Sequence, residues 1–150
     1  MKMTEDLKKA VENMRPGVIT ADGFLGNDER LLVDIIESDE EKIRSLNINL
    51  QDDIKKIRYL FEKGKEAFEE PVTVDNKWLI KVDEARGHLP CPFEDGIFRK
   101  VNLRIKNLDN NEELLITELS LHLIEKHHFF QGKGSTFRVE PEKLKTVLEG

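Results

Sequence analysis

The first 70 residues carry apolar side chains at the spacing of amphipathic helices. Three helical segments are expected there, each with an apolar stripe at steps of three and four residues. The stripes are Leu7, Ala10, Val11 and Met14; Leu31, Leu32, Ile35 and Ile36; and Leu50, Ile54, Ile57, Phe61 and Phe68. Asn27 or Asp28 is the expected cap of the second helix, and Asn49 is the expected cap of the third. The N-terminal part of the chain is therefore predicted to be helical.

After residue 70 the pattern changes to the alternation that is typical of strands. Strands are predicted at 71–74, 78–82, 98–106 and 114–119, and tight turns separate the first from the second and the third from the fourth. A helix is expected over 120–128, a short strand at 137–139 and a last helix over 141–149. Four strands in sequence order favour an antiparallel meander with one face covered.

The fold class expected from these patterns is α+β. A helical N-terminal region and short C-terminal helices are predicted to pack on the meander of about four strands. A chain of 150 residues fits a single domain, 1–150, with a helical part over 1–70 and the β-meander plus helices over 71–150.

Composition and charge restrict the classes of function. The net charge is −6 and 36% of the residues are charged, so the surface repels phosphate backbones, and binding to nucleic acid or anionic membranes is not expected. No apolar run approaches the roughly 20 residues of a membrane-spanning helix, and the N-terminus lacks the apolar core of a signal peptide. A single Cys favours the reducing cytoplasm. The sequence identifies no partner, and a homo-oligomer is compatible with it.

Two segments hold the Cys and all four His of the chain: residues 83–93 and 122–130. In the predicted hairpin, Ile97 enters the first strand and Leu119 leaves the second, so these positions lie at the same end of the sheet. The loop with His88 and Cys91 comes just before Ile97, and the helix with His122 starts just after Leu119. We therefore expect the two segments to meet.

Zinc is the cofactor that such a set of side chains suggests. It takes Cys sulfur, His nitrogen and carboxylate oxygen in a tetrahedron. His88, Cys91 and His122 are the candidate metal ligands, with Glu125 or water as the fourth. His122 and Glu125 share a helix face because they lie three residues apart.

A thiol-dependent reaction is the alternative chemistry. Cys91 and His122 would form a nucleophile–base pair, with Arg86 stabilising the thiolate or orienting an acidic substrate and Glu125 beside them. A structural interpretation stands against both chemistries, since a free Cys is usually a small buried apolar residue and His127 and His128 suit the last turn of a helix. We favour a ligand-binding, protein-binding or structural module, with the metal- or thiol-dependent enzyme as the alternative.

Several segments also resemble a known group of proteins. They are Asp22–Gly26, Asp83–Gly87, Pro90–Phe93, His122–His127 and Phe129–Gly132. Together they resemble a group of small uncharacterised bacterial proteins of unknown function, and the resemblance covers most of the chain. It implies a bacterial, cytoplasmic protein and transfers no catalytic residue, because no activity is assigned to that group.

Overall fold

The computed structural model describes residues 2–150 and has the α+β architecture that the sequence predicts. The helices are α1 (Glu5–Asn13), α2 (Leu32–Ser45), α3 (Leu50–Glu66), α4 (Glu118–His127) and α5 (Pro141–Lys143), which continues into a π-helical turn, η1 (Leu144–Leu148). The strands are β1 (Val72–Val74), β2 (Trp78–Pro90), β3 (Ile97–Asn107) and β4 (Glu113–Thr117). None of the helices within residues 2–150 combines the length and apolarity needed to cross a bilayer.

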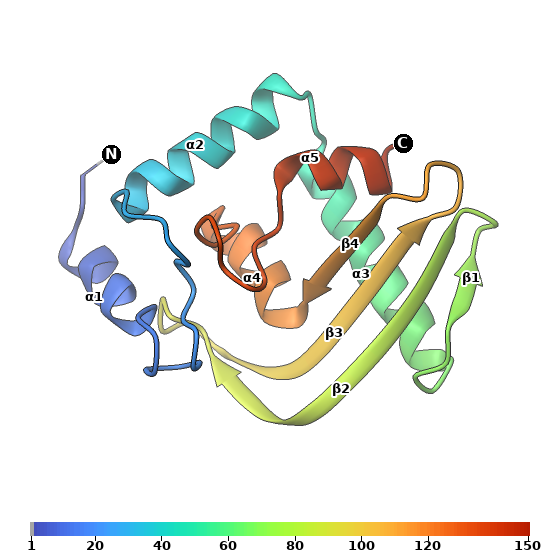
Figure 1. The fold of residues 1–150 in the computed structure, drawn as a ribbon, viewed down its shortest axis with the longest axis horizontal. Coiled ribbons are helices and arrows are strands. Elements are labelled where there is room, and N and C mark those ends of the chain that lie inside the picture. The colour runs from blue at the N-terminus through green and yellow to red at the C-terminus, as the bar shows by residue number, and fades with distance from the viewer. Residues whose placement is uncertain (1) are drawn as a thin grey trace.

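The four strands form one antiparallel meander in the order β1-β2-β3-β4 (Figure 1). The β2–β3 hairpin is much longer than its neighbours, since β1 pairs only with Trp78–Ile80 and β4 only with Asn102–Lys106. The far half of the hairpin therefore extends beyond both outer strands. A bulge interrupts the register between Ala85 and His88 and leaves two residues of β2 without partners on β3.

The near half of the hairpin buries one face under α3 and the C-terminal turn. Its inward side chains are Ile80, Val82, Val101, Leu103 and Ile105, and they share a core with Ile54, Ile57, Leu60 and Phe61 of α3 and with Val147 and Leu148 of η1. Asn49 caps α3 as predicted, because its side chain accepts from the backbone N–H of Asp52 at 3.2 Å. Gly64 does not interrupt this helix; a Cβ there would lie 2.3 Å from Cγ2 of Val82, so glycine permits the close approach of helix and sheet.

The far half of the hairpin buries its opposite face. Leu89 and Phe98 are paired across the strands, at positions that alternate with those of the first set. They pack on a second core formed by α1, α2 and one side of α4. The members of that core are Ala10, Met14, Phe24, Leu32, Ile35, Ile36, Cys91, Leu119, Leu123 and Phe129.

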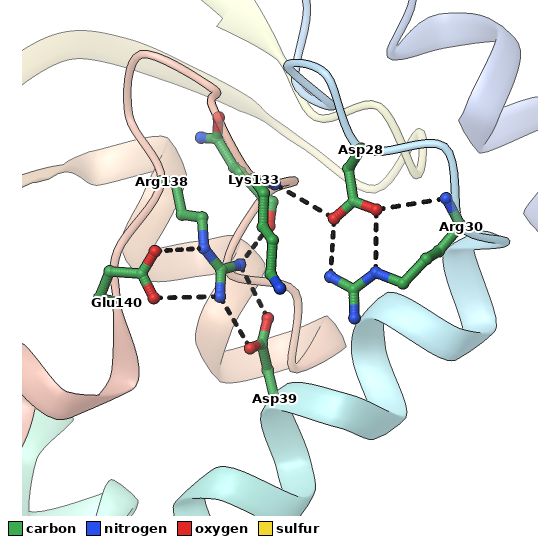
Figure 2. A network of polar contacts seen from close by, with 7 residues as sticks. Asp28, Arg30, Asp39, Lys133, Arg138 and Glu140 are labelled. Atoms are coloured by element: carbon green, nitrogen blue, oxygen red, sulfur yellow. Dashed lines mark hydrogen bonds and ion pairs between the residues drawn. The ribbon is translucent and has the colours of Figure 1, made fainter.

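A buried ion-pair network joins α2 to the segment between α4 and α5 (Figure 2). The guanidinium of Arg138 donates to both oxygens of Asp39 at 2.9 Å, and the two side chains are only 5% and 3% exposed. Arg138 also pairs with Glu140 and donates to the carbonyl of Gln131. Burial alone would lower the pKa of Arg138, but these partners raise it above its ordinary value. The network stabilises a stretch of chain that has little regular structure.

Three local features differ from the sequence-based expectations. The prediction of a strand at 137–139 is wrong. These residues pair with no strand, because the side chain of Arg138 turns inward to form an ion pair with Asp39. The second helix begins at Leu32 without a side-chain cap, since Asp28 binds Arg30 instead. Residues 83–90, expected to form a loop, continue β2 beyond the bulge to Pro90.

A buried pair of carboxyl groups joins α3 to the C-terminal turn. Asp53 is fully buried, and no N–H group within residues 2–150 reaches either of its carboxyl oxygens. Its neighbour is the carboxyl of Glu149. Burial, together with the neighbouring Glu149 carboxyl group, raises the pKa of Asp53 to about 8. Asp53 is therefore mostly protonated at neutral pH.

Raising the pH is expected to destabilise the protein through Asp53. The unfolded chain loses this proton near pH 4 and the folded chain only near pH 8, so the Asp53 contribution is lost as the pH rises between these values. The free energy of unfolding should fall by up to about 1.4 kcal/mol per pH unit in this window. Urea titrations between pH 5 and pH 8 check this. Asp53→Asn should remove the slope and the neighbouring Asp52→Asn should keep it; equal slopes in all three proteins would contradict the assignment.

Candidate metal centre

Four side chains that bind metals meet where the β2–β3 hairpin turns. They are Cys91, Asp95, His122 and His127, and one potential ligand atom from each lies within 4.8 Å of all the others. Cys91 and Asp95 come from the turn between β2 and β3, and the two histidines come from α4. The centre thus connects segments that lie about 30 residues apart in the chain.

The turn between the strands is held by its own backbone. Cys91 donates its N–H to the carbonyl of Gly96 at 2.8 Å, and Glu94 donates to the carbonyl of Cys91 at 2.9 Å. From outside the turn, the side chain of Asn13 on α1 donates to the carbonyl of Pro92 at 2.9 Å. These bonds fix the backbone on both sides of the thiol, which is itself 1% exposed.

Helix α4 positions the two imidazoles on neighbouring turns. It starts at the Thr117 cap, whose hydroxyl accepts from the N–H of Ser120 at 2.9 Å, and ends at His128 in the left-handed conformation. Aromatic rings then orient the imidazoles. Phe93 stacks on His127 with 3.9 Å between ring centroids, and Phe98 lies 4.4 Å from the ring of His122.

The Asp95 carboxylate lies between the two imidazoles. Its Oδ1 is 2.9 Å from Nε2 of His122 and its Oδ2 is 2.7 Å from Nε2 of His127. Burial opposes ionisation of Asp95, but hydrogen bonds from Cys91 and both histidines lower its pKa well below the usual range. Burial lowers the pKa of His127, despite the opposing effect of Asp95.

The surroundings of Cys91 favour the protonated thiol, whereas the surroundings of a reactive cysteine favour the thiolate. Burial and the hydrogen bond to Asp95 raise the pKa of Cys91 to about 12, so it is a neutral donor in the ion-free protein. Nε2 of each histidine lies within hydrogen-bond distance of the Asp95 carboxylate. A thiolate would form here only if a cation entered the centre.

The sequence-based placement of Cys91 and His122 at one end of the sheet is confirmed. The other candidate residues lie elsewhere. His88 is exposed on β2 opposite Arg99, and Arg86 is exposed in the bulge. Glu125 forms an ion pair with Arg58 of α3 and is not a member of the cluster.

Sequence reasoning missed two members, Asp95 and His127. Asp95 lies in the same loop as Cys91, so the predicted hairpin also brings it to this end of the sheet. The sequence pattern places His127 in the last turn of its helix, where a structural role is expected. Its five-residue spacing from His122 is unusual for ligands on one helix face, and it reaches the centre because the ring stacks on Phe93.

One thiol, two imidazoles and one carboxylate make up a donor set that suits tetrahedral zinc. Calcium and magnesium prefer oxygen ligands alone, so the thiol disfavours them.

Comparisons of the chain with protein-family models, curated proteins and solved structures found no match. The assignment of this centre rests on its geometry and its donor atoms.

Alkylation should be slow at Cys91 in metal-free protein. A buried thiol with a raised pKa supplies almost no thiolate at neutral pH, so reaction with iodoacetamide should be at least about a hundredfold slower than for free cysteine. The rate is measured by mass spectrometry on native protein, with urea-unfolded protein as the control for an accessible thiol. A native rate at or above that of free cysteine would show an activated nucleophile and contradict this electrostatic picture.

Proposed function

We propose that the protein is a zinc-binding module in which the ion ties the β2–β3 turn to helix α4. The observation that carries the proposal is the convergence of Cys91, Asp95, His122 and His127 within 4.8 Å. Each of these side chains offers an atom type that zinc binds, and together they supply the four ligands of a tetrahedral site.

The surroundings of the centre favour a structural role for the ion. Four protein ligands fill a tetrahedron and leave no position for substrate, as in zinc sites that stabilise folds. The thiol is buried in the second core, which also contains Phe129 and has Phe93 packed against it. The ion would replace the thiol proton of Cys91, and the freed thiolate and the Asp95 carboxylate would neutralise its charge.

The geometry gives less support to a thiol-dependent enzyme. A Cys–His nucleophile needs a thiolate stabilised by an imidazolium or another cation. Here burial and the Asp95 carboxylate both raise the pKa of the thiol. Arg86, the expected cationic partner, is exposed in the bulge of β2. We therefore keep the binding and structural interpretation, with the cytoplasm as the proposed compartment because a ligating thiol must stay reduced.

Zinc is expected to bind once per chain and to stabilise the fold. A ligand at a hundredfold excess over its dissociation constant adds about 2.7 kcal/mol of stability, which for a protein of this size raises the Tm by about 5 °C or more. Elemental analysis of natively purified protein should find about one equivalent of zinc, and thermal melts of stripped protein with added zinc should show the shift.

Variants test which side chains hold the ion. Cys91→Ser and His127→Ala should each weaken zinc binding at least about tenfold, because each removes one of four ligands. His88→Ala is the matched control, since it removes an exposed histidine outside the cluster. The proposal would be overturned if stripped protein took up no zinc, or if His88→Ala lowered the affinity as much as His127→Ala.

A further inference from the structure

A second feature with the form of a binding site lies on the face of the hairpin that points away from α3. It is a pocket of about 410 Å³ between β3, the loop of residues 19–24 and the loop of residues 131–137. Its apolar walls are Ile19, Phe24, Leu89, Leu119 and Phe137. None of the four residues of the metal centre lines it. Its volume falls in the range of pockets that bind small molecules.

The two loops that form the walls are fixed to each other by backbone contacts. Gly132 donates its N–H to the carbonyl of Phe24 at 2.9 Å, and Asn27 donates to the carbonyl of Lys133 at 2.9 Å. Glycine is needed at this junction, since a Cβ on Gly132 would lie 2.2 Å from the carbonyl oxygen of Leu25. The walls are thus joined without a ligand.

The buried ion pairs fix the second loop to the rest of the fold. Figure 2 shows Arg138 between Asp39 and Glu140, next to the segment that carries Lys133. The backbone N–H of Lys133 also donates to Asp28 at 3.2 Å. Gln131, which lines the pocket, is 4% exposed and adopts a left-handed conformation with φ of 73°. The pocket is therefore preformed, which lowers the entropic cost of binding.

Two polar side chains on the floor of the pocket are unpaired. Lys100 and Asn102 are two residues apart on β3 and so point to the same face. Neither side chain makes a hydrogen bond or ion pair with another group of residues 2–150. Arg99 also lines the pocket but is paired with Glu84 at 3.1 Å. The carboxylate of Asp22 is the acidic group among the lining residues.

We propose that this pocket binds a small organic anion with an apolar body. Lys100 and Asn102 would donate to the anionic group, and the apolar walls would enclose a ring or short hydrocarbon chain. The negative charge of Asp22 would repel the anion and so limit the affinity of the pocket for it. The proposal is independent of zinc, because the pocket and the metal centre share no lining residue.

A pair of fluorescent probes distinguishes the contribution of the charge to binding from the contribution of the apolar body. Anilinonaphthalene sulfonate carries a sulfonate, and N-phenyl-naphthylamine has the same ring system without it. We expect the native protein to bind the sulfonate at least about tenfold more tightly than the neutral probe, as for a hydrogen bond to a charged group. Lys100→Gln should remove this preference and Asp22→Asn should increase it. Arg104→Gln, on the same strand and face but outside the pocket, is the control and should leave it unchanged.

A further variant tests whether the probes enter the pocket. Ala85 is exposed on β2 and lines the pocket, so Ala85→Trp fills it without altering either core. Both probes should lose at least about tenfold in affinity in this variant, and circular dichroism should show the fold retained. Equal binding of both probes by native protein, equal effects of Lys100→Gln and Arg104→Gln, or unchanged binding by Ala85→Trp would each overturn the proposal.

Discussion

The length of the β2–β3 hairpin is the constraint on which the rest of the structure depends. Helix α3 and the C-terminal turn cover only its near half, so the far half needs other apolar partners. Because side chains alternate along a strand, the sheet can bury opposite faces at its two ends. The N-terminal helices and one side of α4 form the second core, on which Leu89 and Phe98 of the hairpin pack, so the protein has two cores.

This arrangement also explains where the two candidate sites lie. The end of the hairpin packs beside α4, so the turn side chains Cys91 and Asp95 meet the helix side chains His122 and His127. Between the two cores, the uncovered face of β3 becomes the floor of the pocket. The ion pair of Arg138 with Asp39 fixes the irregular loop over that floor.

The sequence predicted the features that depend on local periodicity and on strand order. The α3 cap, the meander and the meeting of Cys91 with His122 all follow from patterns within one or two elements. The continuation of β2 to Pro90 could not be found in the same way, because the bulge at Arg86 and Gly87 interrupts its alternation.

Features that depend on tertiary packing were beyond sequence reasoning. His127 belongs to the metal centre because its ring stacks on Phe93. His88 lies outside the metal centre because its position on β2 directs its side chain outward. The inward turn of Arg138 depends on a partner 99 residues away. The pocket likewise forms only where two distant loops meet.

X-ray absorption at the zinc edge of natively purified protein tests the central claim most directly. A zinc ion held by Cys91, Asp95, His122 and His127 predicts one sulfur at about 2.3 Å and three nitrogen or oxygen neighbours at about 2.0 to 2.2 Å. The spectrum should also contain the outer-shell pattern of two imidazole rings. Six oxygen or nitrogen neighbours without sulfur would contradict a site at the end of the hairpin.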